Sequence, residues 1–331
     1  MKILHITDGG LPDPRVERMA LTMKKEGHEL VFLGGQTVGG QYLSAFSDTK
    51  TEPLGIGVSI THSPFLKRRW LNAIREMKPD VIHAHNIIVG HFLLDLKIPA
   101  ILDDHECFSA QSFVFRARPF IRRTAAMTLL RNFPVWEREL ALRYPILTVS
   151  QGIGEYYRHI TDQVGVVENV PYLSEVGWIQ NPPLREGLVY MGRDFSWPRF
   201  SPWRDMSGIR DLLDFDIVSG LPHKDMMIAL TKRKIGLIPF KPHPFHKMCS
   251  LNKMYEYLHA GLQVVLTAKF VDGFDDNPYL YPFTDYTDIV DTVNSVPQAD
   301  PVEIMEFARR NYFWDKQEDI VKRAYSQALN A

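Results

Sequence analysis

Residues 2–33 read KILHITDGGLPDPRVERMALTMKKEGHELVFL, and this stretch decides the fold. Lys2–Thr7 is a short apolar run that ends in an Asp-Gly-Gly turn, as a strand does. Residues 15–26 carry apolar side chains at helical spacing, and Gly27 is placed to end that helix. Residues 29–33 form a second apolar run. The stretch therefore predicts strand, helix and strand, a unit that joins parallel strands by a right-handed crossover.

The same alternation continues along the chain in two blocks. Further strands are predicted at residues 81–83, 100–102 and 147–149, and then at 188–191, 235–238 and 264–266. Alternating strands and helices predict α/β domains with parallel sheets. The domain boundary is expected near Asn169-Val170-Pro171, where prolines begin to accumulate. We predict a first domain over residues 1–170, a second over 171–312, and a segment 313–331 whose helix packs back across the seam.

The composition is that of a soluble globular protein. The 331 residues are 45% apolar and 23% charged, and this length suits two domains. A formal net charge of −1 gives no overall field for nucleic acid, so no such partner is expected. Cys107 and Cys249 fit no metal-binding spacing, and sparse thiols suit a reducing cytoplasm. The N-terminus predicts a first strand and no signal peptide, and no apolar stretch is long enough to span a bilayer.

Polar residues follow several predicted strands, where open parallel sheets bind ligands. Asp103-Asp104-His105-Glu106 comes directly after a strand, so His105 is placed to accept or relay a proton with Glu106 orienting it. A capped helix start with an exposed histidine would use the same residues. His83 and His85 after another strand are similar candidates, and their spacing is not diagnostic of a metal site. Gly10 after the first strand lets backbone approach a ligand, although an ordinary tight turn also needs such a glycine.

The segment SLNKMYEYLHAG, residues 250–261, is the most informative in the second block. The strand predicted at residues 235–238 comes before this segment, which itself contains a polar turn, a helix and a terminal glycine. Backbone N–H groups at the start of this helix suit a diphosphate, and Glu256 can accept two hydroxyl hydrogen bonds from a ribose. An amphipathic helix with Glu256 in water is the alternative. Arg193, which follows the strand predicted at residues 188–191, can pair with a phosphate or lie exposed on the surface.

Residues 107–136 contain no Asp or Glu and interleave aromatic with basic side chains, including Arg116, Arg118, Arg122 and Arg123. Such a surface suits the headgroups of an anionic membrane, and a peripheral contact on the inner face of the membrane is one interpretation. An ordinary core helix with a solvated basic face is the other. Single-stranded RNA would attract similar residues, but the near-zero net charge disfavours it.

Taken together, these segments resemble the retaining glycosyltransferases of family 4, which have the GT-B architecture. The resemblance runs along nearly the whole chain. Similar segments are DPRVE at residues 13–17, DVIHAH at 80–85, DHE at 104–106, ENVP at 168–171, YMGR at 190–193 and NKMYEY with AG at 252–261. The last of these resembles the donor motif and is the most specific.

The resemblance implies two Rossmann-like doubly wound domains facing across a cleft. It implies transfer of a sugar from a nucleotide diphosphate sugar to an acceptor hydroxyl with retention, in the synthesis of polysaccharide, glycolipid or glycoprotein glycans. The acceptor would be a glycan or a lipid-linked molecule, with no metal and no cofactor required. His105 and Glu106 would be catalytic. The donor-binding residues would be Gly10, Gly192, Arg193, Ser250, Leu251, Asn252, Lys253 and Glu256.

Three departures from the family pattern keep other functions open. Met248 stands where a Glu normally contacts the donor sugar, and residues 194–210 offer Arg199 and Arg204 but no Lys. The segment between Arg193 and Asp216 is short, which suggests a reduced βα unit in the second domain. One alternative is a nucleotide-binding or scaffold protein without catalysis. Another is a nucleotide-sugar epimerase of the same architecture, because the fold does not determine the reaction.

Overall fold

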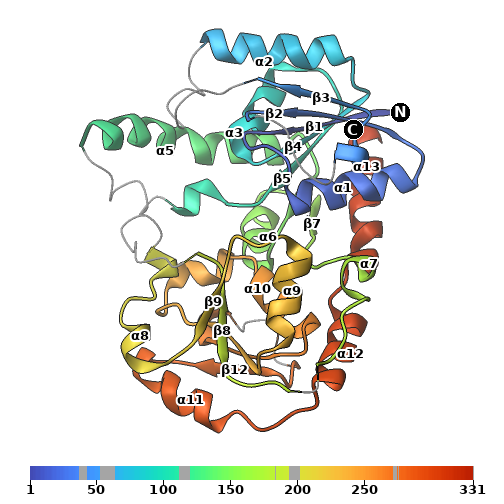
Figure 1. Cartoon of the computed structure of the whole chain (residues 1–331). Helices are drawn as coiled ribbons and strands as arrows, with labels where there is room; N and C mark the ends of the chain where they lie inside the picture. Colours follow the sequence, from blue (N-terminus) through green and yellow to red (C-terminus); the bar gives the residue numbers. More distant parts are fainter. Residues whose placement is uncertain are drawn as a thin grey trace. The chain divides into compact units, whose positions relative to one another are not determined.

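The protein is described here by a computed structural model. It describes residues 1–36, 43–52, 64–111, 120–182, 184–193, 202–270, 274 and 276–330, with no side-chain description for residues 43, 120–130, 202 and 269. The chain divides into two compact units (Figure 1). The first consists of Met1–Glu168 and Gln317–Ala331, and the second of Asn169–Lys316. Each unit is built around one parallel sheet.

The first unit holds a seven-stranded sheet in the order β3-β2-β1-β4-β5-β6-β7, with all neighbouring strands parallel. Its strands are β1 (Lys2–Thr7), β2 (Glu29–Gly34), β3 (Asp48–Thr51), β4 (Val81–His85), β5 (Ala100–Asp104), β6 (Ile146–Thr148) and β7 (Val164–Val166). The predicted strand–helix–strand unit is confirmed. Strand β1 pairs with β2 from Lys2 opposite Glu29 to Thr7 opposite Gly34.

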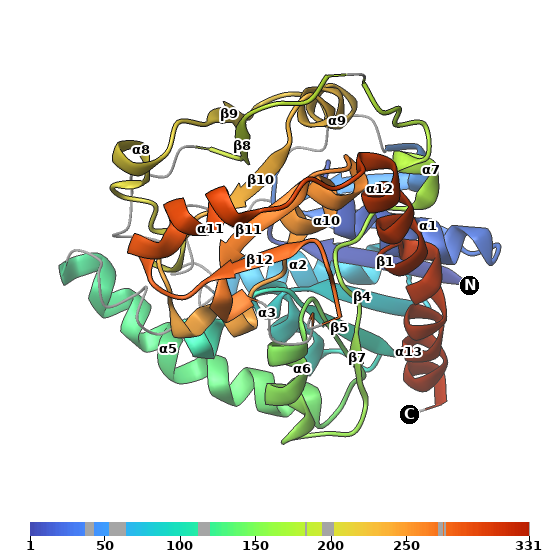
Figure 2. The same cartoon turned by 90° about the horizontal axis from the view of Figure 1, so that it is seen from below.

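The helices of the first unit are α1 (Pro14–Lys25), α2 (Pro64–Met77), α3 (Ile87–Gly90), α5 (Phe120–Ala141), α6 (Gln151–Arg158) and α13 (Glu318–Asn330), with the 3₁₀ turns η1 (Leu43–Ala45), η3 (His91–Asp95) and η4 (Phe108–Gln111). Asp13 caps α1 by accepting from two backbone N–H groups, and Gly27 follows its end with φ +78°. Helix α13 packs against α1 and against β4, β5, β6 and β7 (Figure 2). One sheet face is thus covered by helices from the two ends of the chain.

The second unit holds a five-stranded parallel sheet in the order β12-β11-β10-β8-β9. Its strands are β8 (Leu188–Met191), β9 (Asp216–Val218), β10 (Ile235–Ile238), β11 (Gln263–Thr267) and β12 (Leu280–Phe283). Its helices are α7 (Leu173–Val176), α8 (Ile209–Leu212), α9 (His223–Thr231), α10 (Asn252–His259), α11 (Ile289–Ser295) and α12 (Pro301–Asn311), with the 3₁₀ turns η5 (Pro202–Arg204), η6 (Pro244–Met248), η7 (Ala268–Phe270) and η8 (Tyr286–Asp288), while η9 (Trp314–Gln317) leads back to the first unit. Helix α10 packs on β10, β11 and α12.

Both sheets are doubly wound, so the strand order reverses once in each. The reversal lies between β1 and β4 in the first sheet and between β8 and β10 in the second. Ligands of open parallel sheets bind outside the carboxyl ends of the strands at such a switch point. The relevant chain segments are therefore the ends of β1, β4 and β5 in one unit and of β8 and β10 in the other. Among the described helices, none combines the length and apolar character needed to cross a membrane.

Candidate functional site

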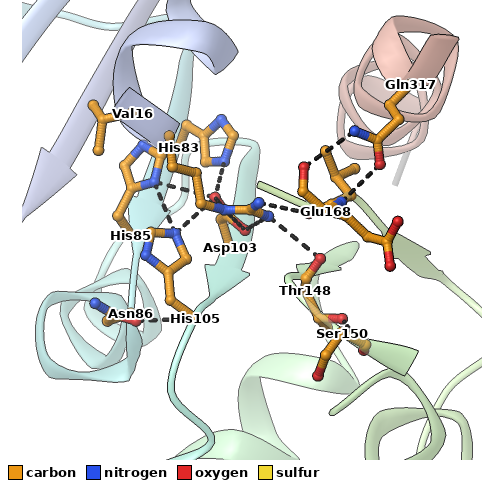
Figure 3. A network of polar contacts seen from close by, with 12 residues as sticks. Val16, His83, His85, Asn86, Asp103, His105, Thr148, Ser150, Glu168 and Gln317 are labelled. Carbon is orange, nitrogen blue, oxygen red and sulfur yellow. Dashed lines mark hydrogen bonds and ion pairs between the residues drawn. The ribbon is translucent and has the colours of Figure 1, made fainter. Parts of the chain in front are cut away.

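The polar residues predicted at the ends of β4 and β5 lie together on one face of the first sheet. His85 pairs with Asp103 in register, and His5 on β1 pairs with His83 on β4. Because side chains two residues apart share a face, His83 and His85 project on the same side. All four of these side chains are buried. Figure 3 shows His85, Asp103 and His105 pointing toward one another.

Arg15 from α1 forms a buried ion pair with Asp103. Its Nε lies 3.1 and 2.9 Å from the two carboxylate oxygens, and Nη2 lies 2.6 Å from Oδ1. The guanidinium also donates to the carbonyl oxygens of Val167 and Thr148. Burial alone would raise the pKa of Asp103, but Arg15 and His105 outweigh burial and hold that pKa well below its usual range. Asp103 is therefore a permanent carboxylate.

His105 is oriented by Asp103. Its Nε2 lies 2.9 Å from Asp103 Oδ2, and its backbone N–H donates to Asn86 Oδ1 at 3.0 Å. Burial would lower the pKa of His105, but the charge and hydrogen bond of Asp103 raise it overall. The sequence assigned the orienting role to Glu106. The structure places the Glu106 carboxylate on Gln111 instead, at 2.9 Å from Nε2.

Behind His105 lies a row of neutral imidazoles. His5 Nδ1 is 2.9 Å from His85 Nε2, and His83 Nδ1 is 2.7 Å from the hydroxyl of Tyr325 on α13. Burial lowers the pKa of all three histidines, and charge repulsion between neighbouring histidines adds to this for His5 and His83. The ring planes of these histidines are stacked within 12–29° of one another. His5 Nδ1 and His83 Nδ1 are used in hydrogen bonds, and one ligand atom from each of the three rings also lies within 4.8 Å of the others, close enough to share a metal ion.

A second buried acidic pair lies beside the same loop. Asp104 and Glu137 have carboxylate oxygens within 4.8 Å of each other and of the Cys107 thiol. Tyr157 donates to Asp104 at 2.8 Å, and Tyr156 donates to Glu137 at 2.7 Å. Burial, followed by the charge of Glu137, raises the pKa of Asp104 to about 7, and burial also raises the pKa of Glu137. The pair can therefore keep a proton near neutral pH.

In the second unit, Tyr257 connects α10 to both strands at the switch point. Its hydroxyl accepts from the Met191 backbone N–H at 2.7 Å and donates to the Leu237 carbonyl at 3.1 Å. Gly236 makes this contact possible, because a Cβ there would lie 2.4 Å from the Tyr257 ring. Tyr257 thereby holds the second turn of α10, which directly follows its first turn, at the carboxyl ends of β8 and β10.

Lys253, on that first turn, is a cation without an acidic partner in the described part of the chain. Its ammonium lies 5.7 Å from the ring centre of Tyr190 and 5.9 Å from that of Phe240. A Cβ at Gly192, whose φ is +131°, would lie 3.3 Å from Lys253 Cε. Burial, followed by the positive charge of Arg204, lowers the pKa of Lys253 to about 8. An anion that comes close to the Lys253 ammonium would therefore offset the free-energy cost of burying its charge.

Glu256 lies one turn after Lys253 on α10 and is bound by His223. The Nε2 of His223, at the start of α9, is 3.1 and 3.0 Å from the two Glu256 oxygens. Glu256 is 12% exposed and His223 33% exposed. Residues at positions i and i+3 lie on the same side of a helix, so Lys253 and Glu256 share one face of α10, although no ion pair between them is among the contacts of the described residues.

The remaining predicted donor-binding residues are found in both units. Ser250 and Leu251 precede α10, whose first residue is Asn252, and no side chain caps the N-terminus of the helix. The Ser250 hydroxyl donates to Asn252 Oδ1 at 2.5 Å. Arg193 is exposed just after β8. Gly10 follows β1 in the first unit, in the same group of strand ends as His105.

Part of the predicted basic surface lies outside the described residues. This applies to Arg116 and Arg118, and for Arg122 and Arg123 only the α5 backbone is described. Met248, where the family pattern has a Glu, is partly buried at the end of η6.

Sequence reasoning missed two partners of the predicted residues. Arg15 entered only as the start of a helix and as part of the similar segment at residues 13–17, and His223 was not considered. Arg15 follows a Pro in the first turn of α1 and lies 88 positions before Asp103, while His223 lies 33 positions before Glu256. Only the strand order brings these residues together, so no local pattern could have identified them.

Comparisons with known proteins support the architecture. No protein-family model matches the chain, and no curated protein matches its sequence. Among solved structures, sucrose-phosphate synthase from Thermosynechococcus elongatus is similar with a TM-score of 0.71 and 12% identity, over 100% of this chain and 99% of that one. The structure of Anabaena HepE in complex with UDP and glucose is similar with a TM-score of 0.66 and 12% identity, over 98% and 99% of the two chains.

A UDP-glucosyltransferase from Polygonum tinctorium capable of glucosylating indoxyl is also similar, with a TM-score of 0.55 and 10% identity over 100% of this chain and 98% of that one. These likenesses extend over whole chains but rest on low sequence identity. They show the fold: an α/β architecture of two parallel sheets shared with GT-B glycosyltransferases, as the sequence predicted.

Proposed function

We propose that this protein is a glycosyltransferase that moves a sugar from a nucleotide diphosphate sugar to an acceptor hydroxyl. One observation carries the proposal. Lys253 and Glu256 stand on one face of α10 at the switch point of the second sheet, and Lys253 has no acidic partner among the described residues. A nucleoside diphosphate offers an anion for the first and two ribose hydroxyls for the second.

The diphosphate is the part of the ligand that Lys253 would recognise. Its ammonium lies over two aromatic rings, and Gly192, which has no side chain, lies against the Lys253 Cε. Arg193 and the uncapped backbone N–H groups at the start of α10 would add further donors. Positive groups at this place would also stabilise the diphosphate as it leaves, the main electrostatic demand of the reaction.

The ribose is the part that Glu256 would recognise. A carboxylate has about four acceptor positions, so both oxygens can receive ribose hydroxyls while His223 keeps its contact. The UDP complexes among the structurally similar proteins favour the same ligand class. In this proposal Lys253 and Glu256 of the second unit bind the donor, and the resemblance adds Gly10 as a donor-binding residue and His105 and Glu106 as catalytic residues.

Ligand binding tests the proposal directly. UDP, GDP and ADP would be titrated into the full chain by calorimetry, and each corresponding nucleotide sugar would then be followed for release of diphosphate. We expect one base to bind clearly, and Glu256→Gln to weaken that nucleotide by about 1–3 kcal/mol, because it leaves polar partners unpaired. Failure of all three nucleotides to bind at millimolar concentration would contradict the proposed donor site.

Retention, the acceptor and the setting of the reaction follow from the family resemblance alone. It favours retention of anomeric configuration without a metal, and a glycan or lipid-linked acceptor. Residues 107–136, which contain arginines and aromatic residues but no Asp or Glu, favour a peripheral contact with an anionic membrane. Flotation with anionic and neutral liposomes at low and high salt tests that contact. Absence of binding to anionic liposomes at low salt would remove it.

A second candidate function rests on Met248. An apolar side chain there cannot make the polar contact that a Glu makes to a donor sugar, which favours a nucleotide-binding protein without turnover. Nucleotide binding without diphosphate release from any donor would support this candidate. A third outcome, conversion of the donor sugar with no acceptor present, would identify an epimerase instead.

A further inference from the structure

The first unit brings two carboxylates and a thiol together in its interior. Asp104 ends β5, Cys107 lies just before the η4 turn, and Glu137 lies on α5. One oxygen of each carboxylate and the Cys107 sulfur lie within 4.8 Å of one another, and all three side chains are fully buried. Three donors of these kinds, supplied by separate elements of one unit, have the composition of a metal site.

The two carboxylates have no cation of their own. Within the described residues no Lys or Arg pairs with Asp104 or Glu137, and His105, whose charge acts on Asp104, is itself paired with Asp103. Buried carboxylates are normally paired with a cation, coordinate a metal ion or hold a proton. The chain without metal adopts the last of these, because burial raises the pKa of both carboxyl groups. A divalent cation can take the place of that proton.

Two atoms of this cluster are left without a close partner by the proton alone. Asp104 Oδ1 makes no hydrogen bond to any described residue, although the side chain is 0% exposed. The Cys107 sulfur lies 4.0 Å from the Ser109 hydroxyl, which is a long contact, and burial raises the pKa of this thiol. A proton shared by the two carboxylates uses neither atom. A bound cation would give both of them a partner, since each offers an electron pair.

Hydrogen bonds from neighbouring elements orient both carboxylates. Tyr157 on α6 donates to Asp104 Oδ2 at 2.8 Å, and Tyr156 donates to Glu137 Oε2 at 2.7 Å. The Ser109 backbone N–H donates to Glu137 Oε1 at 3.0 Å. Partners of this kind fix the direction of metal ligands. Ligand atoms around a tetrahedral zinc ion lie roughly 3.3–3.7 Å apart, so small side-chain rotations would close the cluster around an ion.

We propose that Asp104, Cys107 and Glu137 form a structural site for Zn²⁺, with water in the fourth position. Mg²⁺ and Ca²⁺ prefer oxygen ligands, whereas Zn²⁺ binds both thiolate and carboxylate. As Zn²⁺ binds, the thiol proton and the proton of the carboxyl pair pass to water. The ion would join the end of β5, the η4 turn and α5. The inference does not depend on the proposed function.

Co²⁺ is a suitable probe, because a thiolate bound to this ion gives a strong near-ultraviolet charge-transfer absorption that carboxylates and imidazoles do not give. The full chain would be reduced, freed of metal with a chelator, and titrated first with Co²⁺ and then with Zn²⁺. We expect the absorption to saturate at one Co²⁺ per chain and to disappear when one equivalent of Zn²⁺ is added. Absence of this absorption at millimolar Co²⁺ would overturn the proposal.

The two cysteines of the chain provide a matched pair of variants. Cys107→Ser should abolish the absorption, whereas Cys249→Ser should keep it, because Cys249 is a partly exposed thiol of the second unit. Tyr157→Phe removes the hydrogen bond to Asp104 and should weaken Zn²⁺ binding by about 10-fold. An absorption that survives in Cys107→Ser and is lost in Cys249→Ser would show that the metal binds elsewhere.

X-ray absorption at the zinc edge decides the question in the unmodified chain, even if Cys107→Ser does not fold. We expect one sulfur ligand, with oxygen ligands for the rest. Imidazole ligands would instead place the ion on the second cluster of the same unit, His5, His83 and His85, and would contradict the proposal. None of these measurements contains a nucleotide, so a failure of the proposed function would appear separately, in the calorimetry.

Discussion

The site around His105 in the first unit and the site around Lys253 in the second unit differ in how their charges are paired. In the first unit every charge of the Arg15–Asp103–His105 group has a partner of opposite sign within hydrogen-bonding distance. In the second unit the ammonium of Lys253 lies near two aromatic rings and has no acidic partner among the described residues, and the nearby cation Arg204 lowers its pKa further. The first site is complete without a ligand and presets one imidazole. The second is electrostatically incomplete, which is the expected state of a site that receives an anion.

Arg15→Met should break the first site and give the largest effect. The change leaves Asp103 buried without its main partner, and loss of one member of a buried pair costs about 3–5 kcal/mol. Urea unfolding followed by tryptophan fluorescence would measure the loss in the free energy of unfolding. Arg138→Met, on the exposed side of α5, is the matched control and should change stability by less than about 0.5 kcal/mol. A similar small loss for Arg15→Met would mean that the pair contributes little.

Lys253→Met should weaken ligand binding without reducing stability, in contrast to Arg15→Met. It removes a partly buried cation that has no acidic partner among the described residues, so we expect stability to stay the same or rise. Affinity for the nucleoside diphosphate should fall by about 1.5–3 kcal/mol, the value of a hydrogen bond to a charged group. Lys234→Met, exposed just before β10 at the other end of the sheet, should change neither quantity. Unchanged calorimetric affinity in Lys253→Met would remove the phosphate contact from the proposal.

The sequence predicted the elements of both sites but not their charge relations. A helix was predicted within residues 250–261, and α10 spans Asn252–His259. His105 was selected because it follows a strand, and that position holds in the structure. The partners of His105 could not be predicted from the sequence, because Arg15 reaches Asp103 only when β1, β4 and β5 are arranged side by side in the sheet. Periodicity identifies which residues share an element, whereas ion pairs depend on how elements are arranged.

The Asp104–Glu137 pair provides a pH test of the first unit. The pKa of Asp104 is raised to about 7 in the fold, above its unfolded value of about 3.9. Between these pH values the folded state holds more protons than the unfolded state, so the stability that this group contributes falls as the pH rises from about 4 to 7. Asp104→Asn should remove this slope.

The comparison must be made between variants, because the buried histidines act in the opposite direction. The pKa values of His5, His83 and His85 are lowered in the fold. The stability that these histidines contribute therefore falls as the pH falls below about 6.5. The difference in unfolding free energy between Asp104→Asn and the unmodified chain, measured from pH 4.5 to 8, isolates the carboxyl group. Glu139→Gln, an exposed change on α5, should give a flat difference. A flat difference for Asp104→Asn would show that the buried pair does not keep its proton.

The smallest expected effect is that of a change at His223 in the second unit. It would separate the proposed contact of Lys253 with the diphosphate from that of Glu256 with the ribose. His223 holds both oxygens of Glu256, so His223→Ala should loosen that carboxylate and weaken nucleoside diphosphate binding by about 0.5–1.5 kcal/mol. Inorganic pyrophosphate has no ribose, so its affinity should not change, whereas Lys253→Met should weaken both ligands. Lys224→Ala, at the exposed neighbouring position, controls for changes in α9. If His223→Ala weakened pyrophosphate as much as the nucleotide, Glu256 would not be acting through the ribose, and the two side chains of α10 would share one role.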